Sequence, residues 1–166
     1  AYIERHVREG VAVVRVMPNT PALVDEGMAA ISAGTHCDDQ HLAVAERLLG
    51  ATGRVIRVPE KQQDAVTAIS GSGPAYLFLM AEAMTEAGIA EGLPREQAER
   101  LARATVAGSG ALLAADKSPA ADLREAVTSP GGTTQAALTV LMADDGLKAL
   151  MKRAIHAARK RAEELR

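Results

Sequence analysis

One segment of the chain combines flexible backbone and hydroxyl groups at the point where a helix is predicted to begin. Residues 128–134 read Thr-Ser-Pro-Gly-Gly-Thr-Thr, and an apolar helical pattern follows from Ala136. Pro130 fixes φ, the two glycines let a ligand approach the main chain, and the first N–H groups of a helix lack partners within it. Because the helix dipole favours an anion there, this segment is suited to a carboxylate. An ordinary Pro-Gly loop with a Thr cap is the alternative.

A second polar segment follows a predicted buried strand. Residues 11–17 form a β-branched run, and Pro18-Asn19-Thr20-Pro21 comes directly after it. Open α/β sheets place ligand-contacting loops at the carboxyl ends of their strands. Asn19 can donate and accept there, so it could bind the carboxamide of a nicotinamide. The alternative is an Asn that only completes a turn between two prolines.

The segment Ser70-Gly71-Ser72-Gly73-Pro74 is a weak nucleotide motif. It has neither the lysine and preceding strand of a phosphate loop nor the third glycine of a dinucleotide fingerprint. We interpret it as a tight entry to a helix whose backbone and hydroxyl donors face a ligand in the same crevice as the Gly131 loop.

Hydrolytic and metal chemistry are poorly supported. The four histidines (His6, His36, His41 and His156) show neither a nucleophile elbow near a serine nor the spacing of a zinc site, so no metal is expected. The single Cys37 cannot form an internal disulfide and fits a reducing compartment.

The composition is that of an ordinary cytoplasmic protein. The chain has 166 residues, 48% hydrophobic and 24% charged, with a formal net charge of −2 and three aromatic residues. Without a basic excess or stacking rings, nucleic acid is a poor candidate partner. We find neither a leader nor an apolar run of the roughly 18 residues that a membrane span needs.

The chain changes from a sheet-like to a helical pattern near Glu60 and Lys61. Strands are predicted at 11–17, more weakly at 27–33, and at 54–58, with one helix between the last two. Helices follow from Gln62 to the end. We therefore expect a mostly α fold with a small α/β start. Gly108 and Gly110 interrupt the long second helix, and their cost of about 1 kcal/mol each predicts close backbone packing, either between two subunits or within the chain.

Three motifs, taken in order, resemble the pyrroline-5-carboxylate reductase family. They are Arg15–Pro21, Asp64–Tyr76 and Leu123–Thr134, with Gly92-Leu93-Pro94 at the start of the long helix. The resemblance implies NAD(P)H-dependent reduction of 1-pyrroline-5-carboxylate to L-proline, the last step of proline synthesis. It also implies cytoplasmic homodimers that often assemble further.

The resemblance assigns roles to individual residues. Thr134 would be the catalytic hydroxyl that bonds the imine nitrogen. The substrate-binding residues would be Val127, Ser129, Gly131, Gly132, Thr133 and Thr134. Met17, Pro18 and Asn19 would meet the cofactor, NADPH or NADH, and Thr67 and Ser72 would line the pocket.

The resemblance also predicts two domains and one departure. Residues 1–60 would be the C-terminal remnant of a Rossmann-like dinucleotide-binding domain, and residues 61–166 a helical substrate-binding and dimerisation domain. The family's Gly-rich βαβ fingerprint does not occur in these 166 residues. We therefore expect a truncated chain that alone binds dinucleotide poorly and turns over little. Two alternatives are an inactive helical dimerisation module and a related dehydrogenase, although Lys117 is the only lysine near the long helix.

Overall fold

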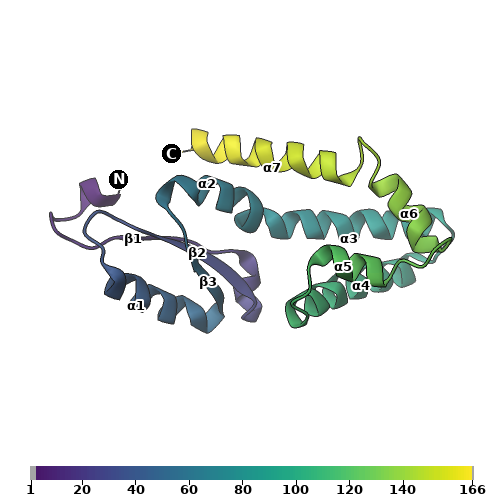
Figure 1. Cartoon of the computed structure of the whole chain (residues 1–166), viewed down its shortest axis with the longest axis horizontal. Helices are drawn as coiled ribbons and strands as arrows, with labels where there is room; N and C mark the ends of the chain where they lie inside the picture. The colour runs from purple at the N-terminus through teal and green to yellow at the C-terminus, as the bar shows by residue number, and fades with distance from the viewer. Residues whose placement is uncertain (1–2, 166) are drawn as a thin grey trace. The chain divides into compact units, whose positions relative to one another are not determined.

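The computed structural model describes residues 3–165 and divides the chain into two compact units. One unit contains Ala1–Pro74 and Ala154–Arg166, and the other contains Ala75–Arg153. Figure 1 shows strands only in the first part of the chain, followed by helices. This mostly helical fold with a small sheet at its start confirms the predicted fold class.

The sheet has three strands in the order β1-β2-β3. β1 (Val14–Met17) pairs antiparallel with β2 (Gly27–Ala33), and β2 pairs parallel with β3 (Gly53–Arg57). The first strand is shorter than the predicted 11–17 because β2 ends at Ala33, the partner of Val14, and offers no ladder to the residues before it.

The weakly predicted strand is the centre of this unit. β2 has a neighbour on both edges, and its residues Ala29, Ala30, Ile31 and Ser32 are buried. Ser32 Oγ donates to the carbonyl of Val58 (2.7 Å) and accepts from Nε2 of the fully buried Gln63 (2.7 Å). Small side chains weaken the strand signal in the sequence but let α1 and the segment after β3 approach the sheet closely.

Helix α1 (Asp39–Leu49) connects β2 to β3 and begins with a side-chain cap. Asp38 Oδ1 accepts from the backbone N–H of His41 (3.0 Å), and this bond lowers the pKa of the Asp38 carboxyl. At the other side of the helix, Arg57 of β3 donates to both carboxylate oxygens of Glu46, at 2.6 and 2.8 Å. The cap stabilises the start of α1, and the ion pair connects the helix to β3.

The remaining elements are helical. Short 3-10 segments lie at Ile3–His6, Thr20–Val24, Gly50–Thr52 and Glu60–Gln62. The longer series is α2 (Gln63–Val66), the π turn η5 (Thr67–Gly71), α3 (Gly73–Ala90), α4 (Arg95–Ala115), α5 (Ala120–Ala126), α6 (Thr133–Leu141) and α7 (Leu147–Glu164).

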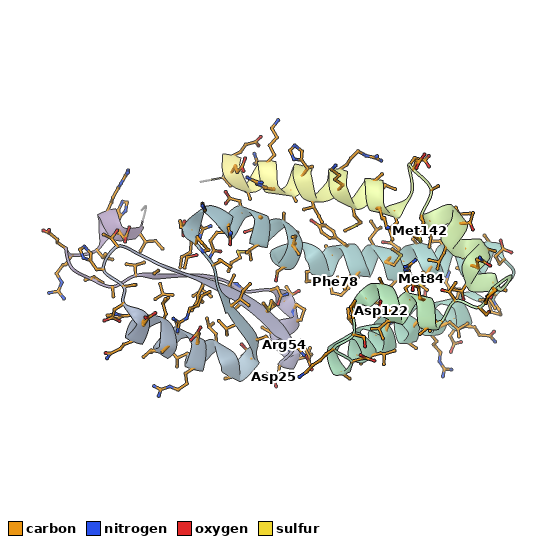
Figure 2. The ribbon with its side chains drawn as sticks, viewed as in Figure 1. Asp25, Arg54, Phe78, Met84, Asp122 and Met142 are labelled. Atoms are coloured by element: carbon orange, nitrogen blue, oxygen red, sulfur yellow. The ribbon has the colours of Figure 1, made fainter. Side chains whose placement is uncertain are left out.

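The unit Ala75–Arg153 buries very little of its apolar surface. Ala98 and Ala102 are the buried hydrophobic residues among its described positions. Large apolar side chains remain exposed on several helices, and Figure 2 shows Phe78 and Met84 on α3 and Met142 at the end of α6. None of the described helices is long and apolar enough to cross a membrane.

Candidate functional site

The loop after β1 lies against the π turn η5. Asn19 precedes the 3-10 segment Thr20–Val24, and its side chain makes two hydrogen bonds. Oδ1 accepts from the backbone N–H of Met28 at 2.8 Å, and Nδ2 donates to Ser70 Oγ at 3.3 Å. One side chain therefore connects the end of β1, the start of β2 and the π turn.

Met17 contacts the same turn through its sulfur-bearing side chain. A Cβ placed on Gly71 would lie 2.6 Å from Met17 Cε, so only glycine leaves room for this packing without a shift. Met17, Asn19 and the Thr67–Gly71 turn are thus brought together within one unit.

The π turn itself was not predicted from the sequence. Its i→i+5 bond runs from the N–H of Ser72 to the carbonyl of Thr67 (2.8 Å), while Thr67 Oγ1 donates to the carbonyl of Gln63 (2.8 Å). Thr67 therefore uses its hydroxyl proton within the helix, and Ser72 is half-buried at the end of the turn. Such turns are frequent at functional sites. Ser70 belongs to the segment interpreted from the sequence as offering hydroxyl donors to a ligand, but it was not among the named pocket residues Thr67 and Ser72.

The predicted carboxylate loop lies in the unit Ala75–Arg153. Pro130 and Gly131 occupy the central positions of a turn closed by the Gly132 N–H, which donates to the carbonyl of Ser129 at 3.0 Å. Gly131 has φ of +72°, and a proline followed by such a glycine is the pattern of a type II turn. A Cβ on Gly132 would collide with Ser129, so both glycines are required, for different reasons.

Helix α6 begins at Thr133, within one residue of the start near Thr134 that the sequence predicts, because the turn delivers Thr133 directly into helical backbone. Gly132 is its N-cap and offers no side-chain cap. Gln135 Oε1 instead accepts from the Gly131 N–H at 2.6 Å. Among the described residues, the N–H groups of Thr133, Thr134 and Gln135 have no acceptor, so these are the amides available to an anion.

The residues around this helix start are open to a ligand. Ser129, Gly131 and Thr133 are exposed, Thr134 is half-buried, and Val127 is 64% exposed. Thr128 uses its hydroxyl to donate to the carbonyl of Arg124 (2.6 Å), which leaves the other hydroxyls of the loop for a ligand.

Residues 17–21, 67–72 and 127–134 contain no Asp, Glu, His, Lys, Arg, Cys or Tyr side chain. The carboxyls whose pKa is lowered are Glu4, Asp38, Glu46 and Asp116, and backbone N–H donors or Arg57 cause these shifts. The arrangement therefore offers hydrogen bonds and helix-end charge rather than a strong acid or base. Within residues 3–165 there is no cluster of three or more His, Cys, Asp or Glu side chains that could hold a metal ion.

One hollow of the molecule does not coincide with these motifs. It has a volume of about 220 Å³ and is lined by charged and polar residues near the start of the chain, among them Glu4, Arg8, Thr35 and His36. No residue of the three motifs lines this hollow.

A family model for pyrroline-5-carboxylate reductase dimerisation matches residues 60–165. The chain belongs to the pyrroline-5-carboxylate reductase family. The reductase of Synechocystis sp. is 45% identical over 154 residues, which cover 93% of this chain and 57% of that protein. The Mycobacterium tuberculosis reductase is 44% identical over an alignment of 183 positions, which covers 100% of this chain and 62% of that protein.

Solved structures of the family have the same fold. The Coxiella burnetii reductase superposes with a TM-score of 0.92 at 41% identity, over 98% of this chain and 60% of that one. The Plasmodium falciparum enzyme with NADP bound gives 0.85 at 31% identity, over 98% and 65%. The resemblance inferred from the motifs is confirmed, and the chain spans about three fifths of the length of these relatives.

Proposed function

We propose that the protein reduces 1-pyrroline-5-carboxylate to L-proline with NADPH or NADH, and that this chain holds the substrate's carboxylate at the start of α6. Family membership supports the reaction, and the uncapped amides of Thr133 and Thr134 are the observation that carries the assignment. The curated relatives are named for this reaction. The cytoplasm is the compartment we propose.

The substrate site is built from the loop and first turn described above. A carboxylate at the two amides gains charge-assisted hydrogen bonds and a favourable interaction with the helix dipole. The residues proposed to surround the substrate are Val127, Ser129, Gly131, Gly132, Thr133 and Thr134. Val127 offers an apolar wall to the ring carbons, and Ser129 a hydroxyl at the rim.

Thr134 is the proposed catalytic residue. Its half-buried hydroxyl stands in the first turn of α6, beside the amides that hold the anion, and from there it bonds the imine nitrogen. A Thr hydroxyl is a weak acid, so its role is to orient the imine and to position or relay the proton that the nitrogen gains.

The cofactor side is proposed at the loop after β1. Met17, Pro18 and Asn19 would contact the nicotinamide end, and Thr67 and Ser72 would line the pocket. Met17 packs on Gly71, and the Asn19 side chain is held by its bonds to Met28 and Ser70. These contacts support a cofactor-facing surface that is already formed in the chain. When bound, the nicotinamide supplies the hydride for the C=N carbon. These residues fit that end of the cofactor only, since residues 3–165 contain no glycine-rich phosphate loop after a strand.

We also propose that residues 61–166 form the dimerisation and substrate-binding domain, and residues 1–60 the nucleotide-binding side. The exposed apolar surface of the helical unit supports a homodimer, which can assemble further. A monomer would leave many such side chains in water, among them Leu77, Phe78, Leu101, Leu112, Leu113 and Val140.

The catalytic assignment is tested by Thr134→Ala in the protein made from the complete reading frame. We expect kcat/KM for imine reduction to fall at least about tenfold, corresponding to about 1.4 kcal/mol of lost transition-state stabilisation. Thr139→Ala is the matched control, because Thr139 is on the same helix and donates its hydroxyl to the carbonyl of Gln135. Equal rates for the two variants would remove Thr134 from the mechanism.

A further inference from the structure

The hydrogen-bond chain from Met28 through Asn19 to Ser70 has a fixed direction. The backbone N–H of Met28 can only donate, so the Asn19 atom that faces it at 2.8 Å must be the carbonyl oxygen Oδ1. The amide nitrogen Nδ2 then faces Ser70 Oγ at 3.3 Å. This removes the usual ambiguity between the two ends of an Asn side chain.

The direction of these two hydrogen bonds decides whether the Ser70 hydroxyl can donate its proton to a ligand. A hydroxyl has one proton and two lone pairs, and Ser70 Oγ already accepts from Asn19. Its own proton must therefore point elsewhere. In the described part of the chain its hydroxyl donates no hydrogen bond, in contrast to Thr67, whose proton is taken by the carbonyl of Gln63.

Ser70 also occupies the right place for a ligand contact. It is half-buried in the π turn, adjacent to Gly71, on which the Met17 side chain packs. All of these residues belong to one unit, so their arrangement depends on no contact between units.

We propose that Ser70 donates a hydrogen bond to the carboxamide oxygen of the bound nicotinamide. Asn19 is then a positioning residue, because its carboxamide is occupied by Met28 and Ser70 and acts by directing the Ser70 proton toward the ligand. This inference rests on the proposed function and refines it, since it assigns the direct contact to Ser70 rather than to Asn19.

The discriminating variant is Asn19→Asp. A carboxylate keeps the acceptor for Met28 and can still bond Ser70, but only by accepting the Ser70 proton. The connection between loop and turn is thus retained while its direction is reversed. If Ser70 only connects the loop to the turn, the Asn19→Asp variant should keep its activity. If Ser70 donates a hydrogen bond to the ligand, Asn19→Asp should lose that bond as fully as Ser70→Ala does.

The experiment uses the protein from the complete reading frame with NADPH and with its thionicotinamide analogue. It measures the equilibrium dissociation constant of each by fluorescence titration without the imine, and then the steady-state kinetics. Ser70→Ala and Asn19→Asp should raise the dissociation constant for NADPH more than that for the analogue. In the analogue a sulfur, which is a weak acceptor, replaces the carboxamide oxygen. We expect Ser70→Ala and Asn19→Asp each to lower kcat/KM for NADPH about tenfold, with little change in KM for the imine. The preference for NADPH over the analogue should fall by a similar factor, and the double variant should lose no more than either single one.

Thr52→Ala is the matched control, because Thr52 lies in the same unit and donates its hydroxyl to the carbonyl of Leu49. It should leave both the rate and the preference unchanged, and melting curves verify that every variant is folded. Wild-type preference in Ser70→Ala, or full activity in Asn19→Asp, would overturn the proposal. A loss confined to KM for the imine would also overturn it and assign Ser70 to the substrate. Absence of imine reduction by the wild-type protein would instead refute the proposed function.

Discussion

At the scale of single residues, the proposed substrate loop, residues 127–134, depends on backbone conformations rather than on reactive side chains. Gly131 adopts φ of +72° and Gly132 lies against Ser129, and together they direct Thr133 and Thr134 into the first turn of α6. The two threonines present unpaired amides at the start of the helix. A catalytic role for such groups is orientation, which agrees with the absence of acidic, basic, Cys and Tyr side chains from residues 127–134.

The first prediction concerns Gly131→Ala. Space is available for a Cβ, but an L residue at this φ costs roughly 1–2 kcal/mol. We expect the free energy of unfolding to fall by about 1 kcal/mol in urea titrations, and KM for the imine to rise as the α6 start is displaced. Gly50→Ala is the control, because Gly50 has φ of −60° and also has free space around it. Equal stability of the two variants would contradict the strain argument.

Some of this residue-scale detail could be read from the sequence. A Pro-Gly pair predicts a turn with a positive φ at the glycine, and the structure has it. The capture of the Gly131 amide by Gln135 could not be predicted, since a glutamine four residues away has many rotamers and only the folded turn selects one. The same applies to Ser70, whose importance appears only when Asn19 is seen to face it.

At the scale of elements, the cap of α1 couples helix stability to pH. The backbone N–H of His41 lowers the pKa of the Asp38 carboxyl in the folded state. A group with a lowered folded pKa stabilises the fold above its unfolded pKa, near 3.9 for Asp, and this stabilisation is lost as the pH falls through the folded value.

The second prediction follows for Asp38→Asn. Asparagine still caps a helix, so the variant keeps the hydrogen bond and loses only the charge. We expect its melting temperature to lie below that of the wild type near pH 7, and the difference to shrink as the pH is lowered through about 4 and below. Thermal melts across that range measure this, with Asp144→Asn, outside α1, as a reference. A difference that grows on acidification would contradict the sign of the pKa shift.

Most elements could be predicted because their patterns are local. The β-branched run before Pro18, the helix between the second and third strands and the change to helical periodicity all appear in the structure. The π turn could not be predicted, because its extra residue per turn is set by tertiary contacts, namely Gly71 against Met17 and Ser70 against Asn19. The central position of β2 is likewise a property of pairing, which its Ala-rich sequence does not reveal.

At the scale of the whole molecule, the apolar side chains exposed on the helices of Ala75–Arg153 indicate a surface that a second copy of the chain would cover. Apart from Ala98 and Ala102, the described hydrophobic residues of the helical unit are not buried, and nothing lies within 4 Å of a Cβ placed on Gly108 or Gly110. Within this chain those two glycines thus serve no packing purpose. Their cost to α4 is explained if the backbone of a second copy approaches there.

The third prediction tests that explanation with Gly108→Ala and Gly110→Ala. If a second copy packs on these positions, the added methyl groups should weaken the homodimer even though alanine favours helix by about 1 kcal/mol. Analytical ultracentrifugation over a range of concentrations gives the dissociation constant, and we expect it to rise at least tenfold. Thr139→Ala on α6 serves again as the control. Unchanged assembly with higher thermal stability would show that the glycines face solvent.

The central claim is that the start of α6 binds the carboxylate of the product and substrate. The most direct test is a crystal structure of the protein from the complete reading frame with L-proline bound. The claim predicts the proline carboxylate within about 3.2 Å of the amide nitrogens of Thr133 and Thr134, with the ring nitrogen beside the Thr134 hydroxyl. Proline bound elsewhere, with these two amides in contact with solvent or with the protein's own side chains, would contradict it.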